Sequence, residues 1–95
     1  MDRSYQITPR DPMLGDGWNL VLFDQGEIVG GGVFPIAHEE PHVGMAWWNS
    51  ATEDERAHWL MIASSAVPAA ARYAFRLIQT HDEAQAEADH WMNHS

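Results

Sequence analysis

Two histidines and a glutamate near the middle of the chain have the types and spacing of a zinc-binding motif. Residues 38–42 read His-Glu-Glu-Pro-His, which matches the H-E-x-x-H pattern of zinc metalloproteases. In those enzymes one helix presents both histidines to the metal, and the glutamate acts on the zinc-bound water. Pro41 interrupts the match, because it disfavours helical geometry at Glu40 and removes a backbone donor. We therefore predict an acidic surface loop, with His38 and His42 as weak metal candidates.

The sequence signals for other catalytic or nucleotide-binding sites are weaker still. The chain has no cysteine, so it offers no thiol nucleophile and no thiolate zinc site. The glycines at 30–32 are flanked by valines within a strand-like segment, whereas a phosphate-binding loop leads from a strand into a helix. Close packing or a β-bulge is the simpler reason for them. We predict no enzyme, no catalytic residue and no cofactor.

Charge narrows the classes of partner. Fourteen acidic residues face five basic ones, all arginines, for a formal net charge of −9. Phosphate contacts need basic patches, so neither nucleic acid nor an anionic membrane is expected as a partner. The negative charge either keeps the protein soluble or attracts a partner with a basic surface. Such a partner surface could be one that normally binds nucleic acid. No stretch reaches the ~20 apolar residues of a membrane span, and the N-terminus does not resemble a signal peptide. We expect a cytoplasmic protein.

Five tryptophans are many for 95 residues, and most should lie in the core. Trp47 and Trp48 are adjacent, so in an extended segment only one of them would point inward. An exposed tryptophan is a good interface anchor. Together with the acids at the start of the next expected helix, they give a predicted interface of Trp47, Trp48, Glu53 and Asp54.

The elements that must position these residues begin with strands. In residues 4–8, apolar and polar side chains alternate, which is typical of a short strand. Residues 18–23 and 27–34 also have β-strand patterns, and an Asp-Gln-Gly turn lies between them. We predict a β-hairpin over 18–34. A loop should follow to about residue 43, and then a short extended segment through the tryptophan pair.

Two helices are predicted after the strands. Thr52 and Glu55 form a capping box that starts a helix over about 52–64, although Ser50 with Glu53 is an equally valid start. Pro68 suits the first position of a helix over about 68–92. Its apolar stripe alternates steps of four and three residues, which favours one helix, bent near His81. A second cap at Thr80 leaves two helices as the alternative.

These elements predict a single α+β domain over 1–95. A small antiparallel sheet of two or three strands should pack against the two helices. The predicted core comprises Leu20, Leu22, Ile28, Val33, Phe34, Leu60, Ala74, Leu77 and Trp91.

The chain also resembles a group of small uncharacterised proteins encoded on bacterial integrative and conjugative elements and plasmids. The resemblance rests on residues 17–35, 46–60, 64–75 and 83–92, with the patterns W-x-L…G…VGGG-x-FP and AWWN-x₅-ER-x-x-W. The His-Glu-Glu-Pro-His stretch is not part of this pattern. The resemblance implies a mobile-element setting, in which proteins tune transfer or neutralise host defence.

Three hypotheses follow. The leading one is a non-enzymatic module that binds another protein with a basic surface, such as a restriction or CRISPR effector that it inhibits. The second is a metal-dependent hydrolase that uses residues 38–42. The third is a structural or regulatory homo-oligomer, for example a homodimer, with the long helix as its seam.

Overall fold

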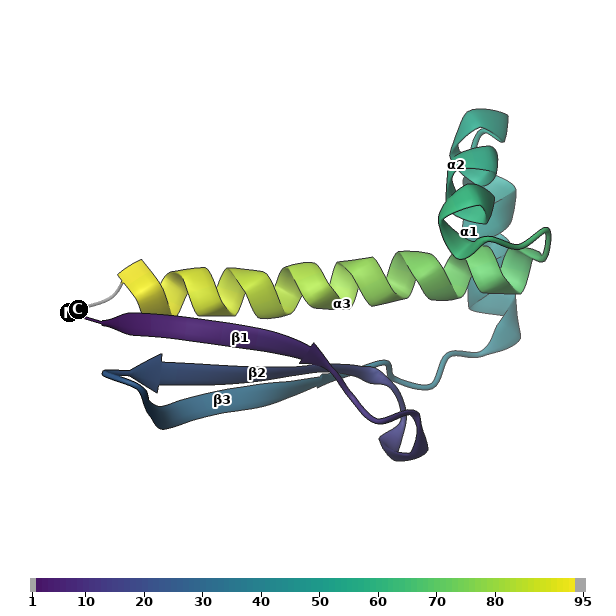
Figure 1. Ribbon diagram of the computed structural model, residues 1–95. Helices are drawn as coiled ribbons and strands as arrows, with labels where there is room; N and C mark the ends of the chain where they lie inside the picture. Colours follow the sequence, from purple (N-terminus) through teal and green to yellow (C-terminus); the bar gives the residue numbers. More distant parts are fainter. Residues whose placement is uncertain (1, 94–95) are drawn as a thin grey trace. The chain divides into compact units, whose positions relative to one another are not determined.

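The computed structural model describes residues 2–93 and shows an α+β fold (Figure 1). The strands are β1 (Arg3–Pro9), β2 (Gly17–Asp24) and β3 (Glu27–Pro35), which form one antiparallel sheet in the order β1-β2-β3. A short 3₁₀ helix, η1 (Pro12–Leu14), separates the first two strands. The helices are α1 (Pro41–Ser50), α2 (Glu53–Ala63) and α3 (Pro68–Asn93). The predicted fold class and hairpin are confirmed, and 68–92 forms one helix.

The sequence prediction was wrong about α1. Residues 41–50 are helical, not a loop followed by an extended segment. Pro41 occupies the first helical position, where its missing N–H costs nothing, and Glu40 before it is extended with ψ 140°. The proline thus ends the loop and begins the helix. In α2, the predicted capping box of Thr52 and Glu55 is present in both directions.

The β2–β3 hairpin closes through Gln25 and Gly26, whose φ values are 53° and 80°. Positive φ at both central residues matches a type I′ turn, whose twist suits antiparallel strands. The register shifts next to Leu22 and Phe23, so that Val29 is an extra residue in β3. This is a β-bulge, one of the two explanations predicted for the glycine-rich strand.

The chain divides into two compact units that share α3. The first contains the chain up to Ile36 and from Gln79 onward, and the second contains residues 37–78. In the first unit the sheet packs one face on the C-terminal half of α3. Leu20 is 3% exposed, and Trp18 meets His81 edge to face with ring centroids 4.8 Å apart. That residues 1–95 form a single domain remains a prediction.

The other end of this α3 segment is held by Arg3 and Tyr5 of β1. The Arg3 guanidinium lies 5.0 Å from the Trp91 ring centre and donates to the Trp91 carbonyl at 3.1 Å. Tyr5 hydrogen-bonds Gln85. The stripe of small residues on α3 therefore packs within the chain: Ala74, Ala84 and Ala88 are buried. A homo-oligomer would have to use another surface than this stripe.

Two predicted core residues are exposed instead. Ile28 is 71% and Val33 is 56% exposed, and both lie on the sheet face opposite Leu20. Val33 follows the alternation of a strand, so it cannot share a face with Phe34. The bulge at Val29 turns Ile28 to the outer face, where it pairs with Phe23. Leu20 and Ala74 are buried as predicted, and the other predicted core residues are half-buried: Leu22, Phe34, Leu60, Leu77 and Trp91.

Candidate functional site

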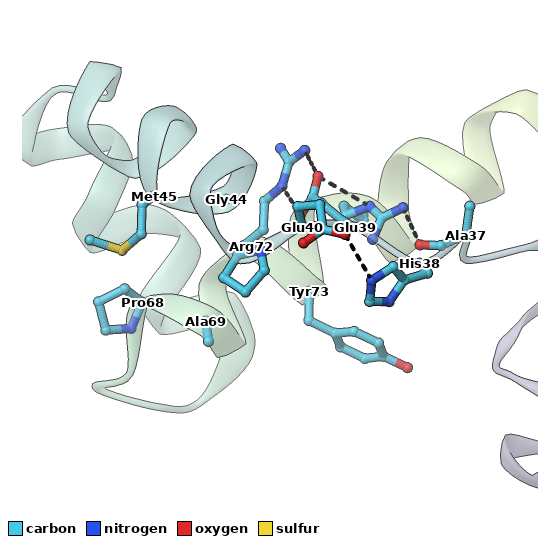
Figure 2. Close-up of a pocket in the computed structure, with 12 residues that line it drawn as sticks. Ala37, His38, Glu39, Glu40, Gly44, Met45, Pro68, Ala69, Arg72 and Tyr73 are labelled. Atoms are coloured by element: carbon cyan, nitrogen blue, oxygen red, sulfur yellow. Dashed lines mark hydrogen bonds and ion pairs between the residues drawn. The ribbon is translucent and has the colours of Figure 1, made fainter.

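The second unit contains a cavity of about 400 Å³ between the loop before α1, α1 itself and the start of α3 (Figure 2). This volume lies within the range of side-chain and small-ligand sites. The lining residues are Ala37, His38, Glu39, Glu40, Pro41, Gly44, Met45, Pro68, Ala69, Arg72, Tyr73 and Arg76. The cavity therefore includes most of the His-Glu-Glu-Pro-His stretch.

A forked ion pair forms the polar end of the cavity. Arg72 donates from Nε to Glu39 Oε2 at 3.0 Å and from Nη2 to Oε1 at 2.5 Å. Both side chains are largely buried, at 18% and 16% exposed. The hydrogen bonds from Arg72 lower the pKa of Glu39 below its ordinary value of 4.5, and this effect outweighs the opposing effect of burial. Glu39 is thus held as a carboxylate that positions Arg72.

A second arginine completes this end. Arg76 lies one helical turn after Arg72, and its Nη2 donates to the Ala37 carbonyl at 2.7 Å. Its Nε lies 4.0 Å from Glu39 Oε1. The loop before α1 is therefore tied to α3 by two arginines. Figure 2 shows Ala37, His38 and Glu39 of the loop on one side of Arg72, with Met45, Pro68 and Ala69 on the other side.

The opposite wall is apolar. Met45 from α1 faces Pro68 and Ala69 at the start of α3 (Figure 2). Met45 is 53% exposed, so its thioether is accessible from solvent. At Gly44 a Cβ would stand 3.4 Å from Arg72 Cγ, so α1 lies in van der Waals contact with this side chain of α3. A flexible methionine beside rigid prolines makes a surface that can adapt to an apolar group.

An aromatic cluster joins the three helices of the second unit. Trp47 lies 5.0 Å from Phe75 and 6.4 Å from Trp59 between ring centroids, and Trp59 lies 5.2 Å from Phe75. The Arg72 guanidinium lies 5.3 Å from the Trp47 ring centre. The cluster joins α1, α2 and α3, and it limits the orientations open to Arg72.

The four residues of the predicted interface occupy different settings. Trp47 belongs to the aromatic cluster, whereas Trp48 is half-buried with the Arg56 guanidinium 5.4 Å from its ring centre. Helical geometry separates the two rings by about 100° around α1. Glu53 and Asp54 are exposed in the first turn of α2, where acids are favoured by the helix dipole. Both tryptophans are half-buried, and an interface formed by these four residues stays a prediction.

The predicted weak metal candidates are separated by the start of α1. His38 lies in the loop with its side chain 83% exposed, 3.6 Å from Glu40, while His42 is the second residue of α1. They therefore do not share a helix face as the histidines of a zinc protease do. Across residues 2–93, no three histidine, aspartate or glutamate side chains gather closely enough to hold a metal ion.

Negative charge is concentrated in the first unit. It holds nine of the fourteen acids and two of the five arginines, and so carries seven of the nine net negative charges. Four of these acids are exposed on the C-terminal half of α3: Asp82, Glu83, Glu87 and Asp89. The second unit is nearly balanced and carries the cavity.

The sequence reasoning missed Met45, Arg72 and Arg76. A detectable signal existed for the arginines, because i, i+4 spacing puts both on one face of a helix that was correctly predicted. No local signal pointed to Glu39 as their partner, since it lies 33 residues from Arg72.

Comparison with protein-family models, with curated proteins and with solved structures found no match.

Within the part of the chain that the structure describes, no helix has both the length and the apolar character needed to cross a membrane.

Proposed function

We propose that the protein is a non-enzymatic module that binds another protein and receives an apolar side chain of that partner in the α1–α3 cavity. The observation that carries the proposal is the cavity itself, with one apolar wall and one end built from a held arginine pair. Such a site can bury a side chain and orient it through polar contacts at the end.

Exposed apolar side chains around the cavity support a protein as the ligand. Val67 precedes Pro68 of the wall and is 56% exposed, and Val43 on the first turn of α1 is 40% exposed. Interfaces combine a buried central pocket with surrounding apolar and polar contacts, whereas a small ligand needs only the pocket. The site therefore suits a protruding side chain on a protein surface.

The charge distribution supports a basic partner. The first unit is strongly acidic, so it would raise the rate of association with a positively charged surface. Added salt would screen this attraction and lower the association rate. In the mobile-element setting that the sequence resemblance implies, the partner would be a component of a host defence complex in the cytoplasm. Inhibition would follow from covering a surface that otherwise contacts nucleic acid.

The experiment is capture from a host lysate, followed by titration of the purified partner against three forms of the chain. Met45→Glu places a charge in the apolar wall. Met61→Glu is the matched control, because Met61 is 73% exposed on α2 and does not line the cavity. Circular dichroism and thermal melting confirm that each variant is folded.

We expect Met45→Glu to weaken binding at least tenfold, the effect of losing about 1.4 kcal/mol or more at an interface centre. Met61→Glu should stay within about threefold of the parent chain. Equal affinities for the two variants would show that the cavity is not the binding site. Failure to enrich any protein over a blank resin, with no change in restriction or CRISPR activity, would overturn the proposal as a whole.

A further inference from the structure

β3 is an edge strand with a long uncharged middle. The sheet order β1-β2-β3 leaves both β1 and β3 at edges. Natural edges are blunted by charged side chains, prolines or bulges. Both edge strands begin with a charged residue and end with a proline, which are Arg3 and Pro9 in β1 and Glu27 and Pro35 in β3. Between its ends, from Ile28 to Phe34, β3 has neither a charge nor a proline. Its bulge is at Val29, near the hairpin end, and residues from Gly30 to Pro35 pair with β2 in unbroken register.

The sequence of β3 is symmetric about Gly31. Residues 29–33 read Val-Gly-Gly-Gly-Val, the same in both directions. Two copies related by a two-fold axis at Gly31 would pair antiparallel, with Gly30 opposite Gly32 and Val29 opposite Val33. Every residue then faces one of its own type. Because antiparallel pairs alternate in hydrogen bonding, this register pairs donors with acceptors whichever residues present them to the edge.

The faces of the sheet agree with this register. Gly32 pairs with the buried Leu20 and so lies on the inner face, as does Gly30 opposite Leu22. Val33 lies on the outer face, opposite Asn19. A two-fold axis perpendicular to the sheet places the inner faces of the two copies on one side and their outer faces on the other. Val33 of each copy would then lie on the outer face, next to the bulged Val29 of the other copy.

Two of the three glycines are not required by contacts within the chain. A Cβ at Gly31 would overlap the Leu20 carbonyl oxygen, so glycine is needed there. At Gly30 a Cβ would stand 3.7 Å from Leu22 Cδ1, and at Gly32 it would stand 3.5 Å from Phe34 Cε2, which are ordinary contacts. Because strand side chains point out of the plane of the sheet, glycine at these two positions reduces crowding between cross-strand neighbours on the inner face.

From the symmetric, uncharged edge we infer that the chain forms a homodimer by antiparallel pairing of β3 with β3 of a second copy. The two three-stranded sheets become one continuous sheet, with the α3 helices on the same side. The inference does not depend on the proposed partner, because it uses the other unit. Since that unit carries most of the negative charge, added salt should strengthen dimerisation, whereas it should weaken binding to a basic partner.

The first test is the solution mass of the full chain by sedimentation equilibrium, from ~1 µM to ~1 mM, which brackets a weak interface of few residues. The mass should rise from 10.7 kDa towards twice that value, more steeply at higher salt. Val33→Lys should raise the dissociation constant at least tenfold. Val67→Lys is the matched control, because both valines are 56% exposed and Val67 lies in the other unit.

The second test fixes the register by disulfide trapping. The chain has no cysteine, and a Cβ at Gly30 or Gly32 would make only ordinary contacts. A mixture of Gly30→Cys and Gly32→Cys chains should form a covalent dimer faster than either variant alone, with thermal melting to confirm that both are folded. The inference would be overturned by a monomer at every concentration, or by a dimer that Val33→Lys leaves unaffected or that Val67→Lys weakens equally. It would also be overturned if the mixture formed a covalent dimer no faster than either cysteine variant alone.

Discussion

Replacing Glu39 by glutamine should destabilise the second unit by removing one charge from the fork that holds Arg72. Arg72 would remain 18% exposed, with a neutral amide that accepts through one oxygen only. Each hydrogen bond to a charged group contributes about 1.5–3 kcal/mol, but the two bonds share one pair of side chains, so they do not add fully. We expect the free energy of unfolding to fall by about 2 kcal/mol.

The assay is chemical and thermal unfolding followed by circular dichroism. For a chain of this length, about 2 kcal/mol corresponds to a fall in Tm of roughly 8–16 °C. Glu40→Gln is the matched control, since it changes the same charge one residue away. The Glu40 side chain is 67% exposed and lies 3.6 Å from His38, so its removal should change stability by less than about 0.5 kcal/mol.

The pH dependence provides an independent check. Because the folded-state pKa of Glu39 is depressed, its stabilisation is fully present above the ordinary value of 4.5 and is lost as pH falls through the folded-state pKa. The parent chain should therefore lose more stability than Glu39→Gln on acidification below about pH 5. Glu55, whose pKa is also lowered, is present in both chains and cancels in the difference. Equal stabilities for the two substitutions, or parallel pH profiles for the parent and Glu39→Gln, would refute the reasoning.

Three further predictions concern the local structure and are checked by thermal unfolding. Thr52→Ala removes the acceptor for the Glu55 N–H and should lower stability by about 1 kcal/mol, and no measurable loss would contradict the cap. Gly31→Ala should cost about 2 kcal/mol or more through overlap with a backbone carbonyl, while Gly32→Ala should cost less than about 1 kcal/mol; the reverse order would contradict the strand geometry. Gln25→Asn should stabilise the hairpin by about 0.5 kcal/mol, since asparagine tolerates the positive φ better, and a loss would argue against the type I′ turn.

Features encoded by neighbouring residues could be predicted. The capping box at Thr52, the turn before Glu27 and the long apolar stripe after Pro68 each depend on a few residues close in sequence, and the structure contains all three. Local signals failed where one residue suited two roles. Pro41 was interpreted as a helix breaker within a motif, yet it is the first residue of α1.

Features that depend on distant residues could not be predicted. The bulge at Val29 arises from the register with β2, and it reverses the face on which Ile28 lies. The cavity depends on Glu39 meeting Arg72, and no spacing rule identifies such a pair. The predicted interface at Trp47 and Trp48 relied on an extended segment, whereas the helix places Trp47 within an aromatic cluster.

The most direct test of the central claim is oxidative footprinting of the methionines with and without the captured partner. Oxidation follows side-chain exposure, and Met45, Met61 and Met13 are 53%, 73% and 92% exposed in the free chain. If the cavity receives the partner, Met45 should be oxidised several times more slowly in the complex, while Met61 and Met13 keep their rates. An unchanged rate at Met45 under saturating partner would contradict the proposed binding site.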